Sequence, residues 1–419
     1  MSARMAHQAI ANGSMSVREL VDSCLKRIEE RQQIVQAFEY VAIDKDGIDI
    51  DPSCAAKMTG PLYGLPFGIK DIIDTAGIPT GYGSPIYRGH IPGFDAACVT
   101  MVKAAGGLIA GKTVSTEFAY STPGSTTNPH NALHTPGGSS SGSAAAVADF
   151  QVPLAFGTQT AGSVIRPSSY CGIVGYKPTF NEFNLAGVKC FSPTLDTLGV
   201  HCRAVEDLPM VRRALIHDTA EVLPRNKPPR IGIFKQAEWE QATPAMKTAI
   251  DKTAATLQSH GADVYVIDLA EIFADAIKAQ TDIMFFDAAR SFSPEYMINK
   301  PLLSTGLVEL VQEGQTITHA EVRRALLIKK QCLMEINEIF QDTDVLMMPS
   351  APGEAPAGLD STGDAVFNRI PTFLGLPAIS LPGHVGDLGL PMGIQFVGSA
   401  HRDNDLIATA LWLEHRLLV

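Results

Sequence analysis

Short apolar strands and amphipathic helices alternate along most of this chain, and no other feature restricts its fold as strongly. Ser16 and Glu19 have the spacing of a helix capping box, and apolar residues then recur at helical intervals to about residue 32. Further helices are predicted over 95–105, 144–148, 243–261, 318–340 and from about 403, and strands over 67–69, 108–113, 152–156, 230–234, 264–267, 344–349, 378–382 and 393–397. Such alternation predicts an α/β sheet with helices on both faces.

The chain shows no internal boundary. No Pro/Ser-rich linker, charge block or repeat divides the 419 residues, so we expect one large domain over 1–419. Residues from about 268 to 317 lack a clear pattern, and we expect them to form a helical cover over the sheet.

The composition excludes several classes of protein. A formal net charge of −11, from 33 basic and 44 acidic residues, argues against nucleic acid or anionic lipid as main partners and favours a small molecule. Seven cysteines without a CxxC pair argue against a disulfide framework or a zinc knuckle. We find neither a signal peptide nor an apolar run of about 18 residues that could span a membrane, so we expect a soluble, cytoplasmic protein.

The segment 106–113 matches the phosphate-loop pattern GxxxxGK[ST], which would make the protein an NTPase. A phosphate loop follows a strand and precedes a helix, so that backbone N–H groups converge on the anion. Here a predicted helix precedes the glycines and an apolar strand follows them. We favour a helix end that leads into a strand, and keep the P-loop-like NTPase as the alternative from a different class.

Two serine patterns match catalytic motifs, but their sequence context does not support a catalytic role. GxSxG at 138–142 would make Ser140 the nucleophile of a hydrolase elbow, but polar, turn-rich residues precede it where a strand is required. Ser23 and Lys26 have the SxxK spacing of penicillin-recognising enzymes, but they fall on the exposed side of the first helix. Helix and turn hydroxyls explain both patterns better.

His130 and His134 have the spacing of a zinc-binding helix. They lack the intervening glutamate, and the prolines that flank the segment disfavour a helix there. We therefore interpret them as two loop histidines and expect no metal site.

Three stretches remain that are rich in serine and glycine: GIKDIIDT at 68–75, GGSSSGSAAAVA at 137–148 and GTQTAGSVIRP at 157–167. In this order and spacing they resemble the amidase signature family of serine hydrolases. About a third of the chain resembles the family, including YCGIVGYKPT and GLPAISLPGHVGDLGLPMGIQFVG. The resemblance implies a single amidase domain with a central twisted mixed sheet, in which 58–200 and 345–400 carry the signature core.

The resemblance also implies a Ser–Ser–Lys triad and an amidohydrolase that cleaves a small carboxamide to a carboxylate and ammonia or an amine. Lys70 matches the family's lysine base, Ser139 its cis-peptide serine and Ser163 its nucleophile. The predicted strand 152–156 leads into a loop of small residues, where a serine would lie beside free backbone N–H groups. We expect an oxyanion hole formed by the N–H groups of Thr160, Ala161, Gly162 and Ser163.

A lysine can act as a base near neutral pH only if its pKa falls by roughly 3 units from about 10.4, and burial can supply such a shift. Lys70 follows an apolar strand, so we expect it to be buried. In the implied reaction Ser163 gives its proton to Ser139, which passes one to Lys70, and an acyl-enzyme forms that water releases. No cofactor is implied.

Several residues depart from the commonest family pattern. Gln159 stands in place of an aspartate, Ala161 and Ser141 stand in place of glycines, and Arg166 follows the nucleophile by three residues. This variant resembles malonamidase-type members, in which the matching arginine binds a substrate carboxylate. The resemblance implies substrate-binding roles for Arg166, Ser141 and Gln159 and a substrate such as malonamate. The alternative for Arg166 is a buried structural arginine bonded to loop carbonyls.

One further alternative and one prediction concern partners. Within the family, an amidotransferase A-type subunit would act in a complex with partner subunits, tRNA and ATP. Because dimers are common among such enzymes, we expect a homodimer whose ligand is a small amide.

Overall fold

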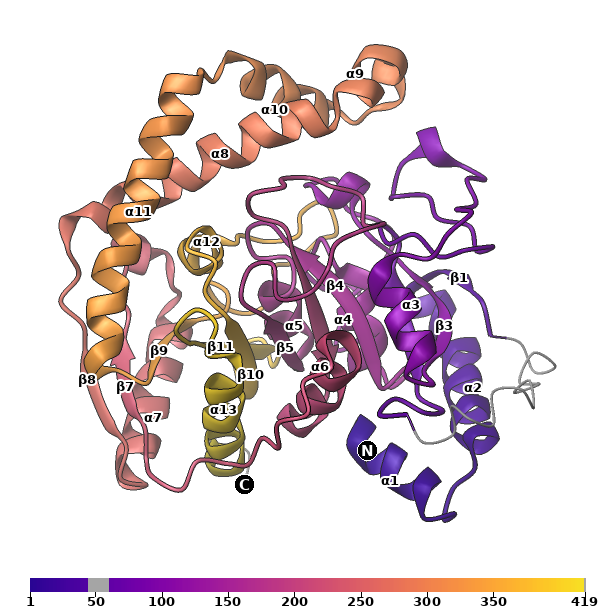
Figure 1. The fold of residues 1–419 in the computed structure, drawn as a ribbon, viewed down its shortest axis with the longest axis horizontal. Helices are drawn as coiled ribbons and strands as arrows, with labels where there is room; N and C mark the ends of the chain where they lie inside the picture. The colour runs from indigo at the N-terminus through magenta and orange to yellow at the C-terminus, as the bar shows by residue number, and fades with distance from the viewer. Residues whose placement is uncertain (44–59, 418–419) are drawn as a thin grey trace.

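The computed structural model describes residues 1–43 and 60–417, which form one mixed sheet of 11 strands (Figure 1). The strand order is β1-β3-β2-β4-β6-β5-β10-β11-β9-β7-β8. The strands are β1 Phe38–Val41, β2 Pro66–Lys70, β3 Leu108–Thr113, β4 Leu154–Gln159, β5 Val174–Lys177, β6 Thr197–Cys202, β7 Arg230–Ile233, β8 Asp263–Val266, β9 Val345–Pro349, β10 Ala378–Val385 and β11 Pro391–Val397. Strand β2 runs parallel to β3 and β4, and β7 runs parallel to β8 and β9, whereas the other pairs are antiparallel.

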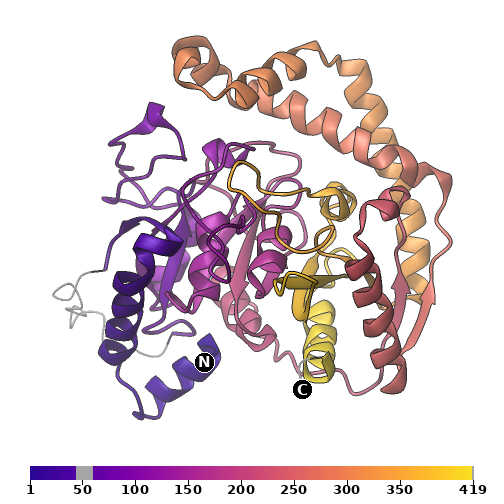
Figure 2. The same cartoon turned by 180° about the vertical axis from the view of Figure 1, so that it is seen from behind.

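Helices cover both faces of this sheet (Figures 1 and 2). Helices α4 and α5 contact each other and pack on the central strands, while α3, α6, α13 and α7 form a second run of contacting helices. The helices are α1 Ala3–Ala11, α2 Val17–Val35, α3 Ala97–Ala104, α4 Ser141–Ala148, α5 Ile165–Cys171, α6 Leu208–Ile216, α7 Pro244–Ser259, α8 Ala276–Ser291, α9 Ser293–Asn299, α10 Thr305–Thr316, α11 His319–Asp342, α12 Val366–Phe373 and α13 Asp403–Leu417. The α/β fold predicted from the alternation is confirmed.

The segment without a clear sequence pattern forms helices α8, α9 and α10. Helix α8 packs against α10, α11 and α12. Both ribbon views place these helices beyond one end of the strands, where they bridge part of that end of the molecule (Figures 1 and 2). They therefore cover the end of the sheet and not one of its faces.

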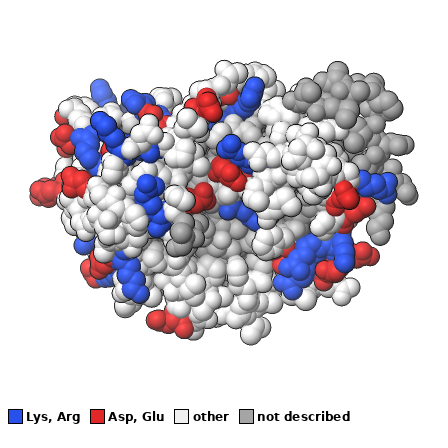
Figure 3. Space-filling view, turned by 90° about the horizontal axis from the view of Figure 1, so that it is seen from below, with Lys and Arg blue, Asp and Glu red and all other residues white. Residues whose placement is uncertain are grey.

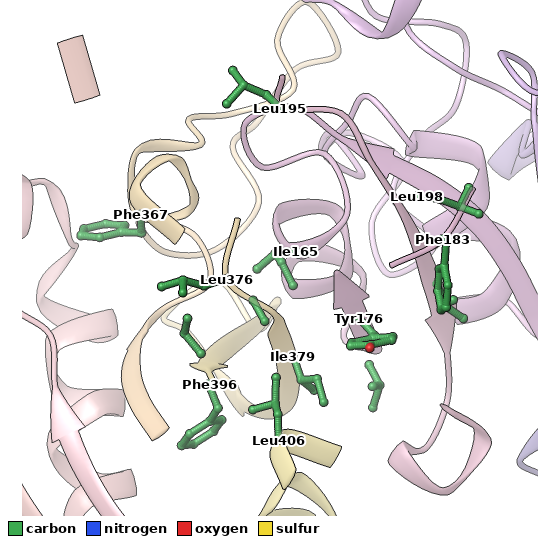
Figure 4. Packing of buried hydrophobic residues seen from close by; sticks show 14 of the residues in the cluster. Ile165, Tyr176, Phe183, Leu195, Leu198, Phe367, Leu376, Ile379, Phe396 and Leu406 are labelled. Carbon is green, nitrogen blue, oxygen red and sulfur yellow. The ribbon is translucent and has the colours of Figure 1, made fainter. Parts of the chain in front are cut away.

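The core lies between the sheet and its helices. Strands β2 and β4 are buried along their whole length, as expected of central parallel strands covered on both faces. Figure 4 shows Ile165 of α5, Ile379 of β10 and Leu406 of α13 within one buried cluster, so helices from the middle and the end of the chain share a core. This packing holds the strands, and therefore the carboxyl ends of the central strands β2 and β4, in place.

The predicted elements differ from the observed ones mainly at their ends. The capping box of Ser16 and Glu19 is present and begins α2. Strand β4 extends to Gln159, three residues beyond the predicted end, so the loop before α5 is shorter than expected. The sequence analysis predicted no counterpart for six elements: α1, β1, β5, β6, α6 and α12.

Charged side chains of both signs are interspersed on the face opposite α8–α10 (Figure 3). The part of this face that is described thus lacks the single-sign character of a nucleic-acid surface. In the described residues, no helix is both long enough and apolar enough to cross a membrane.

Candidate active site

The three serine- and glycine-rich stretches meet at one edge of the sheet. Strands β2 and β4 are parallel neighbours, so their carboxyl ends lie side by side, and β2 ends at Lys70 while β4 ends at Gln159. The loop that follows β4 leads into α5, and the GGSSS stretch leads into α4. Carboxyl ends of strands are the usual location of sites in α/β sheets.

Lys70 is fully buried at this edge. Its Nζ donates to Ser139 Oγ at 2.7 Å and to Thr158 Oγ1 at 2.8 Å. Burial, which disfavours the charged ammonium, lowers the pKa of Lys70 well below its ordinary value. This shift favours the neutral amine, which is the form that can accept a proton from the Ser139 hydroxyl.

Ser139 is held by its backbone. The Gly138–Ser139 peptide bond is cis. The carbonyl of Gly138 accepts from Arg166 Nη2 at 2.7 Å, and the carbonyl of Ser139 accepts from the Thr116 N–H at 3.2 Å. These bonds fix the hydroxyl of Ser139 against Lys70.

Ser163 lies in a cavity of about 430 Å³. The loop residues Thr160, Ala161 and Gly162 line the same cavity, together with Arg166, residues 119–121, Phe191, Met284, residues 361–365 and Arg369. Among the described residues, the N–H groups of Ala161, Gly162 and Ser163 have no hydrogen-bond acceptor. The loop therefore offers unpaired donors beside a partly exposed hydroxyl, as an oxyanion hole requires.

The structure brings Lys70 and Ser139 into direct contact, and it places Ser163 in the cavity. Within the described residues, none of the hydrogen bonds involves Ser163 Oγ. Only glycine fits at position 162, because a Cβ there would lie 2.3 Å from Asn368 Oδ1 and 2.8 Å from Ala365 Cβ. The loop that carries Ser163 can therefore pack this closely against α12 only because residue 162 is glycine.

Gln159 and Ser141 do not line this cavity. The side-chain oxygen of Gln159 accepts from the N–H groups of Val164 and Ile165 at 2.9 and 3.0 Å, and its Nε2 donates to Thr372 Oγ1 at 2.9 Å. Ser141 is buried in the first turn of α4. Both side chains bond other parts of the protein around the site, and their expected contact with a substrate stays a prediction.

Arg166 lines the cavity but has partners within the protein. In addition to Gly138 O, its Nη2 donates to Thr362 Oγ1 at 3.0 Å, and its buried Nε has no partner among the described residues. These are the contacts of an arginine that joins loops, the alternative considered from the sequence. Its role toward a carboxylate stays a prediction.

Sequence reasoning missed three residues of the site. Thr158 contacts Lys70 from β4, and buried Asp196 accepts from Thr160 Oγ1 at 2.6 Å. Burial raises the pKa of Asp196 to about 6. Arg369 of α12 lines the cavity, but no helix was predicted over 366–373, so no signal pointed to it.

The phosphate-loop interpretation is wrong. The segment 108–113 is strand β3, preceded by helix α3. Lys112 is fully buried, and its Nζ donates to Ile73 O, to Thr80 Oγ1 at 3.0 Å and to Thr75 Oγ1 at 3.3 Å. A lysine enclosed in this way cannot reach a bound phosphate.

The weaker motifs also have structural explanations. Ser140 is the buried residue that precedes α4, and Ser23 and Lys26 are exposed on α2. His130 lies in a turn and bonds the carbonyl of Cys171, and His134 forms an isolated β-bridge with Ala357 and bonds the carbonyl of Ala355. No group of three or more potential metal ligands occurs in the described residues.

A family model described as Amidase matches residues 19–407. The A-type subunit of glutamyl-tRNA(Gln) amidotransferase from Picosynechococcus sp. is 32% identical over 475 aligned residues, covering 97% of this chain and 96% of the relative. The same type of subunit from Symbiobacterium thermophilum is 30% identical, covering 98% of this chain and 95% of the relative.

Solved structures share the whole fold. The peptide amidase PAM in complex with chymostatin superposes with a TM-score of 0.82 at 25% identity, covering 99% of this chain and 97% of that chain. The A-type subunit of glutamyl-tRNA(Gln) amidotransferase from Thermotoga maritima superposes with a TM-score of 0.83 at 24% identity, covering 99% of this chain and 94% of that chain.

Proposed function

Because this chain belongs to the amidase family and is an amide-cleaving hydrolase, we propose that Lys70, Ser139 and Ser163 form its catalytic triad. The observation that carries the proposal is the 2.7 Å contact between buried Lys70 and Ser139, at the edge of the sheet where Ser163 enters the cavity. The substrate is a small carboxamide, cleaved to a carboxylate and ammonia or an amine. The reaction needs no cofactor.

In this mechanism Ser163 Oγ attacks the carbonyl carbon of the amide. Its proton passes to Ser139 while the Ser139 proton passes to neutral Lys70, and the N–H groups of the 160–163 loop stabilise the oxyanion. Return of a proton through Ser139 to the nitrogen releases the amine and leaves an ester on Ser163. Water, activated by the same pair, hydrolyses the ester.

A second candidate function is an amidotransferase A-type subunit. The relatives named above favour it, since both are such subunits and are aligned along almost their whole length. The likeness to malonamidase-type enzymes and the expected homodimer both stay predictions. Both candidate functions use the same triad chemistry, so they differ in whether the chain acts alone.

The two candidates are separated by the activity of the purified chain. We expect the chain alone to release ammonia from small amides, because the cavity and the triad lie within one polypeptide. Ammonia release and hydroxamate formation with hydroxylamine, measured over a panel of amides that includes glutamine and malonamate, check this. Activity that appears only after addition of partner subunits would favour the amidotransferase. The mass of the chain in solution tests the homodimer.

Arg166→Ala is expected to lower kcat by roughly 10- to 100-fold for all amides, because it removes a charged donor from the carbonyl that precedes Ser139. Steady-state kinetics on malonamate and on an uncharged amide of similar size give the measurement. A loss confined to KM for malonamate would instead assign the carboxylate to Arg166. Arg290→Ala, on the exposed side of α8, is the control.

A further inference from the structure

Arg369 is the second arginine of the cavity, and its guanidinium is only partly engaged. Nη1 donates to Thr281 Oγ1 at 2.9 Å and to Gln280 Oε1 at 3.3 Å. Its Nε and Nη2 have no partner among the described residues, and neither belongs to the buried unpaired atoms. Two N–H-bearing nitrogens of Arg369 are therefore available to a ligand.

Arg166 offers fewer free donors. Its Nη2 has two protein acceptors and its Nε is buried, so among the described residues only Nη1 is left without a partner. Arg166 is 7% exposed, whereas Arg369 is partly exposed at the cavity wall. Of the two guanidinium groups, Arg369 offers the larger number of free donors to an anion.

The charge of the cavity wall also favours an anionic ligand. Its charged residues are Arg166, Arg369 and Asp364, so the wall carries a net positive charge in a chain whose net charge is −11. Burial lowers the pKa of Arg166, and the charge of Arg369 adds to that effect. Burial raises the pKa of Tyr120, which Arg369 opposes. The field of Arg369 thus reaches two other residues of the cavity wall.

Arg369 is also connected to the loop that carries Ser163. Gln280 accepts from Arg369 through Oε1 and donates through Nε2 to the carbonyl of Thr160 at 3.2 Å. Because Gln280 is fully buried, it holds Arg369 at a fixed place relative to this loop. An anionic group bound by Arg369 would therefore be positioned relative to the reacting hydroxyl.

We propose that Arg369 binds the free carboxylate of an acidic amide substrate, while Arg166 holds the Ser139 loop. The inference rests on the proposed function, and assigns its substrate class to amides that carry a carboxylate near the scissile bond. Guanidinium groups pair with carboxylates in bidentate geometry, which gives orientation as well as affinity.

The test compares succinamate with its methyl ester, which has the same scissile amide without the charge. Arg369→Met is expected to lower kcat/KM for succinamate by roughly 10- to 100-fold, mainly through KM. The loss for the ester is expected to be several-fold at most. Arg369→Lys should recover part of the loss, because the charge remains without the planar fork. Arg290→Met is the matched control outside the cavity.

Binding supplies a second readout that does not depend on turnover. Titration of the Ser163→Ala protein with succinamate should give heat that the Ser163→Ala, Arg369→Met double variant loses. Equal losses for succinamate and its ester, or unchanged binding in the double variant, would overturn the role of Arg369. The proposed function would survive that outcome, since its own test is separate: it fails if Ser163→Ala retains turnover of the ester.

Discussion

Ser163→Ala is expected to lower kcat by on the order of 10⁵- to 10⁶-fold, because loss of a serine nucleophile removes the covalent route entirely. The hydroxyl lies in the cavity, and no hydrogen bond of the described residues depends on it, so the fold should be unchanged. Ammonia release and hydroxamate formation measure the loss, and an intact-mass search for the acyl-enzyme shows whether it forms.

Ser23→Ala is the matched control, since that hydroxyl is exposed on α2 far along the chain from the site. It should behave as the wild type. Turnover of Ser163→Ala above a hundredth of the wild-type rate would contradict the triad. Ser140, the other candidate nucleophile from the sequence, would then need to be substituted.

Lys70→Met is expected to lower kcat/KM by roughly 10²- to 10⁴-fold near pH 7, the usual contribution of a general base. Since burial lowers the pKa of Lys70, the wild type should remain active well below pH 10.5, where an ordinary lysine is charged. Activity of the wild type should fall at the lower pH at which Lys70 gains its proton. The variant should lack that step and regain some rate at high pH, which a pH profile of kcat/KM measures.

Lys70→Met should raise the stability of the protein although it lowers the activity. The folded pKa of Lys70 lies below the unfolded value, so the unfolded chain binds more protons between the two, and stability rises with pH across that window. Lys70→Met removes this dependence. We expect its urea midpoint to exceed that of the wild type at pH 7, with a gain that shrinks as the pH approaches 10.5.

Lys177 offers the matched control. It is fully buried outside the cavity, its Nζ donates to Pro178 O, and burial lowers its pKa to about 7. Lys177→Met should show the same kind of pH-dependent gain in stability while keeping its activity. If both variants lose activity equally, the loss at Lys70 reports disturbed packing and not a missing base.

Much of the sheet could be predicted because its strands are short apolar runs bounded by glycine and proline. The position of Lys70 at the end of such a run also predicted its burial. The order of the strands could not be predicted, because pairs such as β5 with β10 join segments about 200 residues apart, and local pattern carries no information on long-range pairing.

Some parts of the site could not be predicted for the same reason, because their positions depend on structure beyond the local sequence. Gln159 was expected in a loop, but β4 continues to that residue, so its side chain turns back to the α5 N-terminus. Arg369 lies on a helix that includes Pro371 and follows a turn-rich segment, which hid the helical pattern. Contacts that depend on tertiary packing, such as Gln280 with Thr160, had no sequence signal at all.

The residues of the site come from two parts of the fold, the central strands and the helices near the ends of the strands. Lys70 and Thr158 belong to central strands, whereas Met284 and Arg369 reach the cavity from helices beyond the end of the sheet. Substitutions in α8 or α12 that change the lining of the cavity can therefore leave the contact of Lys70 with Ser139 and Thr158 intact. The two parts of the fold thus allow the choice of amide to vary separately from the lysine–serine contact on which the proposed reaction depends.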